Sequence, residues 1–313
     1  MFKKLFYALL LFNILLSSSF AESIKNKPVF VIGQDSQSIE DFFSSLKQFN
    51  IKEISYPDGI MVYTSINSVN GLDEPSYNGA GTNYADGLLK KYPDIKIVQI
   101  GLYMKDMLDE VINGSFDDNI DKLGTWIKNS NKTVYLRIGY ECDNPENDYN
   151  SEKYINAYRH IVNRLKNNGV ANTYFVWHTI AWNGNNKNPY NPISYYPGDD
   201  YVDMIGISFF DATAVKERKI VSDIALNKKK PLMIAESSPF NQYSIEKKLA
   251  WMKTLFKYVK DYNVSFISYI NVNWNELPMF ESQNWGDARL QHNKILIEKW
   301  SDNIKQFKKH KEF

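Results

Sequence analysis

Two glutamates, Glu141 and Glu236, come at the ends of short apolar runs in the sequence. Glu141 follows T-V-Y-L-R-I-G-Y (133–140), and Glu236 lies within P-L-M-I-A-E-S-S (231–238). Such runs are typical of buried strands. If the fold brings the two carboxyl groups together, one can donate a proton while the other attacks a carbon, provided that their surroundings separate their pKa values. Paired carboxylates of this kind are the chemistry of glycosidic-bond hydrolysis.

An arginine, Arg137, stands in the middle of the first run, and a buried charge requires a partner. Alternate residues of a strand point to the same side, so we expect Arg137 and Gly139 to lie below Glu141 on one inner face. Gly139 would leave room there for the guanidinium or for substrate. A cation in this place favours an ionised carboxylate nearby. A purely structural ion pair is the alternative, and both interpretations predict a carboxylate beside Arg137.

Apolar runs of strand length recur eight times and alternate with amphipathic helical segments. The expected strands are 28–35, 59–64, 96–103, the run beginning at 133, 172–178, 202–211, 231–238 and 264–274. The expected helices are 38–49, 105–112 with 117–129, 151–168, 214–228, 243–262 and 289–308; the Gly- and Asn-rich segment after the second strand predicts a long loop with a short helix. Alternation of this kind implies parallel strands with right-handed crossovers. Eight units predict an α/β fold, a single (β/α)8 barrel over residues 22–313.

Sites of such barrels lie at the carboxyl ends of the strands, where polar residues are therefore informative. Trp274 is the first candidate for a platform that stacks on a sugar, beside Asn273. His178 is expected to bond a sugar rather than a metal, since no second histidine is suitably spaced. For four further residues, sugar binding and structural capping are equally supported: Tyr63, Tyr103, Gln34 and Asp35. Trp182 is expected at the rim of the cleft.

Three segments carry a family resemblance. Y-Y-P-G-D-D-Y-V-D-M-I-G (195–206) resembles the approach to the sixth strand in glycoside hydrolase family 26. The motif R-x-x-x-E, Arg137 to Glu141, is similar to that family's fourth-strand motif, and 231–238 to its seventh strand. The resemblance covers 133–238 with good motifs and the rest more loosely. It implies a retaining (β/α)8 glycoside hydrolase with Glu141 as general acid/base and Glu236 as nucleophile.

The resemblance has departures. The family usually has histidine immediately before its acid/base glutamate, where this chain has Tyr140. At the end of strand six the family usually has a tyrosine that bonds the nucleophile, where this chain has Phe210. The chain is therefore expected to be a divergent member. The implied mechanism is double displacement, with the carboxyl groups about 5–5.5 Å apart. The expected substrate is β-mannan or a related β-linked polysaccharide.

Composition limits the other possibilities. M-F-K-K followed by an apolar run to Leu16 and small residues predicts a secretory signal peptide over 1–21, cleaved after Ala21. We therefore expect a secreted or periplasmic protein without stable membrane insertion. The mature chain would keep 35 basic and 36 acidic residues, a balance unlike that of a nucleic-acid binder. A single cysteine, Cys142, excludes an internal disulfide framework. We expect no cofactor, no metal and a monomer.

Two alternatives remain open. One keeps the clan but changes the substrate to a β-glucan, a β-xylan or a bacterial exopolysaccharide. The other is a barrel that binds a glycan without cleaving it, or that assists polysaccharide export. The glutamate pair with Arg137 argues against the second alternative, and Tyr140 and Phe210 argue for it.

Overall fold

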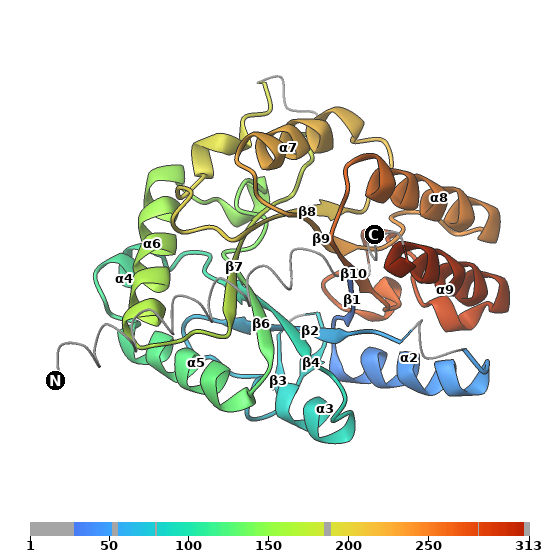
Figure 1. Cartoon of the computed structure of the whole chain (residues 1–313), viewed down its shortest axis with the longest axis horizontal. Helices are drawn as coiled ribbons and strands as arrows, with labels where there is room; N and C mark the ends of the chain where they lie inside the picture. Colours follow the sequence, from blue (N-terminus) through green and yellow to red (C-terminus); the bar gives the residue numbers. More distant parts are fainter. Residues whose placement is uncertain (1–27, 52–55, 79, 185–188, 281, 310–313) are drawn as a thin grey trace, which may run out of the picture.

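Eight parallel strands close into a barrel in the computed structural model, which describes residues 28–51, 56–78, 80–184, 189–280 and 282–309 (Figure 1). Around the barrel the strands follow the order β1-β10-β9-β8-β7-β6-β5-β2. Their bounds are β1 Val29–Gly33, β2 Gly59–Ser65, β5 Ile97–Tyr103, β6 Thr133–Ile138, β7 Thr173–Thr179, β8 Met204–Phe209, β9 Leu232–Ser237 and β10 Phe266–Ile270. The predicted (β/α)8 fold is confirmed.

Helices surround the barrel on all sides in Figure 1. They are α2 Ser36–Gln48, α3 Ala85–Lys91, α4 Leu108–Ile112, α5 Asp117–Ser130, α6 Ser151–Asn167, α7 Val215–Asn227, α8 Ile245–Asp261 and α9 Lys294–Lys309. The last helix starts later than predicted, because a short 3-10 turn, Leu290–His292, comes before it. The segment after β2 contains the expected short helix, α3, and also a hairpin that the sequence did not predict, β3 Ser76–Tyr77 with β4 Thr82–Asn83.

The interior of the barrel changes from apolar to polar along the strands. Near the strand starts, Val29, Met233 and Phe266 belong to an apolar cluster inside the barrel. Further along, two strands change to buried polar residues on their inward face: Tyr135 is followed by Arg137 on β6, and Val176 by His178 on β7. Since alternate residues of a strand share a face, these polar side chains continue the inward face toward the carboxyl ends.

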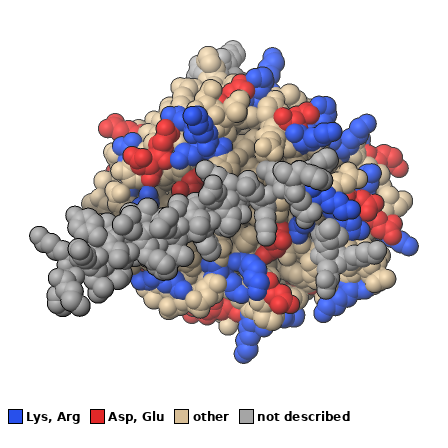
Figure 2. Space-filling view, in the orientation of Figure 1, with Lys and Arg blue, Asp and Glu red and all other residues tan. Residues whose placement is uncertain are grey.

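Positive and negative side chains are interspersed on the face of the molecule seen in Figure 2. Among the described helices, none is long and apolar enough to cross a bilayer. The predicted signal peptide, residues 1–21, lies outside the residues that the structure describes.

Candidate active site

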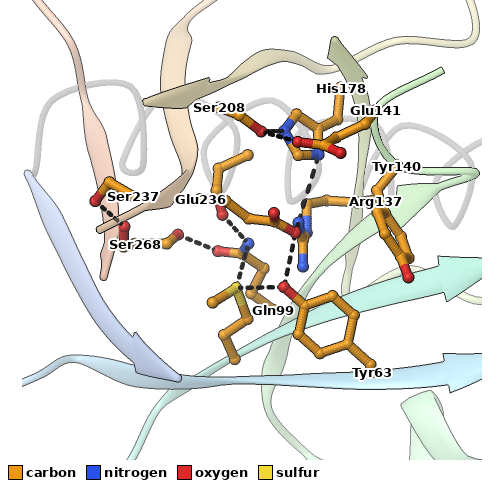
Figure 3. A network of polar contacts seen from close by, with 12 residues as sticks. Tyr63, Gln99, Arg137, Tyr140, Glu141, His178, Ser208, Glu236, Ser237 and Ser268 are labelled. Atoms are coloured by element: carbon orange, nitrogen blue, oxygen red, sulfur yellow. Dashed lines mark hydrogen bonds and ion pairs between the residues drawn. The ribbon is translucent and has the colours of Figure 1, made fainter. Parts of the chain in front are cut away.

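Glu236, on β9, lies at the centre of a network of polar contacts at the carboxyl end of the barrel (Figure 3). Its Oε1 accepts two hydrogen bonds, one from Nη1 of Arg137 and one of 2.7 Å from Oη of Tyr63. Within the described residues no donor bonds its Oε2. Two donors on one oxygen leave the other free to react, and both donors favour the ionised carboxylate.

Arg137 is fully buried and lies beside two tyrosine rings that also contact each other. Its guanidinium carbon is 5.0 Å from the ring centre of Tyr63 and 5.4 Å from that of Tyr140. The space for the guanidinium comes from Gly101 on the neighbouring strand β5. A Cβ at that position would lie 2.6 Å from Cδ1 of Tyr63 and 2.9 Å from Nη2 of Arg137. No residue larger than glycine therefore fits there without displacing one of the two side chains that hold Glu236.

The geometry corrects two predictions about Arg137. Strand β6 ends at Ile138, and both Gly139 (φ +55°) and Glu141 (φ 50°) have left-handed backbone conformations, so 137, 139 and 141 do not share one face. A Cβ on Gly139 would instead meet Met104 and Tyr154, and this glycine makes no room for the guanidinium. The carboxylate that bonds Arg137 is Glu236, not Glu141.

Glu141 is held in the turn after β6 by two side-chain donors. Oγ of Ser208 donates to its Oε1 at 2.6 Å, and Nδ2 of Asn144 donates to its Oε2 at 2.8 Å. Burial, followed by the negative charge of Glu236, raises the pKa of Glu141 to about 8, although the bonds from Ser208 and Asn144 act to lower it. At neutral pH the Glu141 carboxyl is therefore protonated, as a general acid must be.

His178 does not have the predicted role of bonding a sugar. The residue is fully buried on β7, and both ring nitrogens face other side chains: Nε2 is 3.0 Å from Oγ of Ser208, and Nδ1 is 3.4 Å from Nη1 of Arg137. Burial, and then the charge of Arg137, place the pKa of His178 well below its ordinary value. It is a neutral link inside the network.

A further layer of contacts supports Glu236 from within the barrel. Nε2 of Gln99, on β5, donates to the carbonyl oxygen of Ala235 at 2.7 Å, across the barrel from its own strand. Oγ of Ser268, on β10, donates to Oε1 of Gln99. Gln99 thus fixes the backbone immediately before Glu236.

Sequence reasoning missed four residues of the site: Gln99, Ser208, Asn144 and Ser268. Gln99 had a detectable signal, because a glutamine inside the apolar run I-V-Q-I-G needs a partner in the core. Serines and asparagines in strands and turns are too common to be noticed without a structure.

Several other predicted residues have structural roles. Asp35 caps α2 by accepting the Ser38 amide, and the buried Gln34 donates to the carbonyl of Ala80. Of their two equally supported interpretations, the structure therefore favours the structural one. Asn273 accepts the amide of Asn275 at a short 3-10 turn.

Trp274 is only 2 % exposed, and its Nε1 donates to Ser238. Its ring packs against three other aromatic rings, those of Phe210, Phe280 and Trp285. The prediction of an open stacking platform is therefore wrong for Trp274, because its ring faces are covered by neighbours. Trp285, which is half-buried, is the more exposed tryptophan of this cluster.

Tyr63 has neither of the two roles that the sequence predicted for it. Its hydroxyl bonds Glu236, so it neither caps an element nor is free for a sugar. Phe210, at the end of β8, has no hydroxyl that could bond Glu236. The hydroxyl of Tyr63, on β2, makes this bond instead. Tyr103 is half-buried beside Tyr140, with ring centres 6.4 Å apart, and Trp182 is 45 % exposed in the segment after β7. Their proposed contacts with sugar stay predictions.

The sequence model of Glycosyl hydrolase family 26 matches residues 139–280 of this chain. Two curated relatives are β-1,3-xylanases: one from a Vibrio species is 27 % identical over 302 residues, and one from an Alcaligenes species is 26 % identical over 311. These alignments cover 87 % and 90 % of this chain. The chain is a divergent relative of glycosyl hydrolase family 26. It spans 64 % of the length of each of these two curated relatives.

Solved structures of family 26 share the fold. The catalytic domain of an endo-β-1,4-mannanase from Bacillus sp. JAMB-750 superposes with a TM-score of 0.63 at 15 % identity, over 90 % of this chain and 88 % of that one. A family 26 β-mannanase from Bacteroides ovatus gives a TM-score of 0.63 at 14 % identity, over 95 % and 93 % of the two chains. The match to the family model begins at Gly139 and includes both Glu141 and Glu236.

Proposed function

We propose that this chain is a retaining endo-β-glycosidase that hydrolyses a β-linked polysaccharide by double displacement. The observation that carries the proposal is the difference between its two carboxyl groups. Glu236 accepts bonds from Arg137 and Tyr63 on a single oxygen, whereas burial raises the pKa of Glu141 to about 8. One group is thereby suited to attack and the other to donate a proton.

In the first step Oε2 of Glu236 forms a bond to the anomeric carbon, the glycosidic C–O bond breaks, and Glu141 gives its proton to the departing oxygen. In the second step Glu141, now a carboxylate, takes a proton from water. The water oxygen attacks the anomeric carbon and releases Glu236. Arg137 and Tyr63 stay on Oε1 throughout, so the charge that returns to Glu236 is met by donors already in place.

The first polymer to test is β-1,3-xylan. The two curated relatives that align over most of this chain, at 27 % and 26 % identity, are described as β-1,3-xylanases. β-1,4-Mannan, named by the neighbouring structures, has weaker support, because those neighbours are only 14–15 % identical. Cleavage after Ala21 and export are part of the same proposal, and the intact mass of the protein recovered outside the cytoplasm of its source would test them.

The test is the release of reducing ends by residues 22–313 from β-1,3-xylan, β-1,4-xylan, β-1,4-mannan and a β-glucan, alongside Glu141→Ala and Glu236→Ala. We expect activity on one polymer, its loss in both variants, and a first product that keeps the β configuration by proton NMR. Inversion of the anomeric centre would contradict double displacement. Binding to a polymer without cleavage by the wild-type chain would favour a glycan-binding protein instead.

A further inference from the structure

Three buried side chains connect the two carboxyl groups of the site (Figure 3). Starting from Glu236, the contacts run through Arg137, then His178, then Ser208, and end on Oε1 of Glu141. Each of the three connecting residues comes from a different strand: β6, β7 and β8. The pairing register between β8 and β9 shifts between Ile207 and Ser208, which sets Ser208 opposite Glu236.

The direction of every hydrogen bond in this connection follows from the first residue. A guanidinium carries only donors, so Arg137 must donate to Nδ1 of His178. Burial and Arg137 keep the pKa of His178 well below its ordinary value, so the ring is neutral and has one proton. That proton must then sit on Nε2, which donates to Oγ of Ser208. The single proton of Ser208 is left to point at Oε1 of Glu141.

The reverse direction is disfavoured. A proton on Oε1 of Glu141 would have to be donated to Ser208, and Ser208 would then have to donate to Nε2 of His178. His178 would be forced to carry its proton on Nδ1, against the donor N–H of Arg137. In a fully buried site two facing donors are costly.

The other oxygen of Glu141 is fixed by a separate residue. Asn144 accepts the amide of Glu146 on its Oδ1 at 3.0 Å, so its amide nitrogen faces Oε2 of Glu141. A protonated carboxyl oxygen can still accept one such bond while its O–H points elsewhere. Oε2 is therefore the oxygen that can hold a proton without breaking a contact of the network.

We propose that Ser208, oriented by His178 and Arg137, is a positioning residue that keeps Oε1 of Glu141 unprotonated, so that Oε2 carries the proton given to the leaving oxygen. The use of this arrangement in catalysis rests on the proposed function. The series of hydrogen bonds from Arg137 through His178 and Ser208 to Glu141, called the relay below, can be measured without substrate. The titratable and charged groups around Glu141 and the relay are Glu236 on β9, Arg137 on β6, His178 on β7, and Tyr140 and Asp143 beside Glu141.

The first measurement is the tautomer of His178 in the wild-type chain, by ¹⁵N NMR of its ring, with His178→Phe used to assign the signals. We expect a neutral ring protonated on Nε2 from pH 5 to pH 9. A proton on Nδ1, or a ring that becomes charged within this range, would overturn the relay.

The second measurement is the titration of Glu141, by ¹³C NMR of labelled glutamate carboxyls, assigned with Glu141→Gln. Loss of the donor in Ser208→Ala should raise the pKa of Glu141 by about one unit, the effect of a hydrogen bond to a charged group. Ser208→Thr keeps the hydroxyl and should titrate like the wild type. Ser222→Ala is the matched control, because Ser222 is also a buried serine whose hydroxyl is hydrogen-bonded, in α7.

An unchanged titration of Glu141 in Ser208→Ala would overturn the proposal, and so would a shift of the same size in Ser222→Ala. If the chain is active, Ser208→Ala should lower kcat/KM on the polymer about tenfold. It should leave the rate nearly unchanged on an aryl glycoside with an acidic phenol, which departs without a proton. If both NMR measurements gave the expected results but the chain cleaved no polymer, the proposed function would be contradicted and the relay would still be supported.

Discussion

At the level of single residues, the site places two chemically identical side chains in different electrostatic surroundings. Glu236 faces a fixed cation and a phenol, both of which favour its charge. The donors to Glu141 in the described part of the chain, Ser208 and Asn144, are neutral, and Glu141 faces the negative Glu236, so its burial is not compensated. The residue type alone carries no such information, since the difference lies in the contacts.

The hydroxyl of Tyr63 can be tested by removing one oxygen atom. Tyr63→Phe keeps the ring against Arg137 but deletes the donor to Oε1 of Glu236. We expect kcat/KM to fall about 10- to 100-fold, because a hydrogen bond to a charged group is lost at the proposed nucleophile. The control is Tyr158→Phe in α6, a buried tyrosine whose hydroxyl bonds nothing in the described part of the chain. Equal losses in both variants would contradict a specific role for Tyr63.

The protonation of Glu141 predicts the pH dependence of the reaction. In the proposed mechanism Glu141 must be protonated to assist the leaving group. Because its pKa is raised to about 8, kcat/KM should fall as the pH rises through about 8. Steady-state rates between pH 5 and pH 10 would show this alkaline limb. In Glu141→Ala, assayed on an activated aryl glycoside, the limb should disappear. A limb that persists there would have to belong to another group.

At the level of elements, neighbouring strands leave room for each other's side chains. Gly101 of β5 makes the space that Arg137 of β6 and Tyr63 of β2 occupy. Gly101→Ala would place a methyl group 2.6 Å from the Tyr63 ring, and both atoms lie in a packed interior that cannot relax freely. We expect kcat to fall at least tenfold, by the same loss of transition-state contacts as in Tyr63→Phe.

A folding defect must be separated from this local effect. Gly169→Ala is the control, since Gly169 has a φ of +71° and no atom within 4 Å of an added Cβ. That variant should lose about 1 kcal/mol of stability from backbone strain while kcat is unchanged. Measuring kcat and the free energy of unfolding for both variants decides the matter. A Gly101→Ala protein with unchanged kcat would contradict the role given to this glycine.

The link from β5 to β9 is a second inter-element contact that can be tested. Gln99→Leu removes the donor to the carbonyl of Ala235 and the acceptor of the Ser268 hydroxyl. Because both groups would be buried without partners, we expect a loss of about 1–3 kcal/mol of stability. The rate should fall as well, since Ala235 precedes Glu236. Ser265→Ala, on a buried serine that bonds the Leu232 carbonyl before β10, is the control for rate. Unchanged kcat in Gln99→Leu would limit Gln99 to a structural role.

Prediction from sequence succeeded for the elements and failed for particular side chains. The strands were predictable because residues that are buried on both faces of the barrel wall, as Val29 to Ile32 are, form short continuous apolar runs in the sequence. The conformation of Glu141 was not, because strand β6 ends three residues earlier and the turn that follows is held by a bond from Nδ2 of Asn147 to the carbonyl oxygen of Glu141. The burial of Trp274 depends on the rings of Phe280 and Trp285, which arrive from a later loop.

At the level of the whole molecule, the fold is stabilised by its apolar interior and the site is built at a cost to that stability. Val29, Met233 and Phe266 fill the start of the barrel, and helices cover its outside. At the other end, ionisable groups are taken out of water, which favours their neutral forms or requires partners. No cation pairs with Glu141 among the residues that the structure describes, so its ionisation should weaken the native state.

This weakening has a definite pH dependence. The pKa of Glu141 is about 8 in the folded chain and near 4.5 when the carboxyl is in water, so between these values the folded state binds more protons. The stabilising effect of its protonation is complete below pH 4.5 and is lost as the pH rises through about 8. A full shift of this size is an upper bound, because the carboxyl is half-buried and partly screened.

Glu141→Gln removes the titration and keeps the side chain's shape. The free energy of unfolding of the variant minus that of the wild type should therefore increase by about 2 kcal/mol from pH 5 to pH 8. Any effect of the amide on stability that does not depend on pH cancels in this comparison. In thermal unfolding this corresponds to a relative gain in Tm of about 3–6 °C. Glu110→Gln, at an exposed position in α4, should show no such change with pH. If the two variants behaved alike, the carboxyl of Glu141 would not be the group whose ionisation the fold opposes, and its assignment as the proton donor would lose its physical basis.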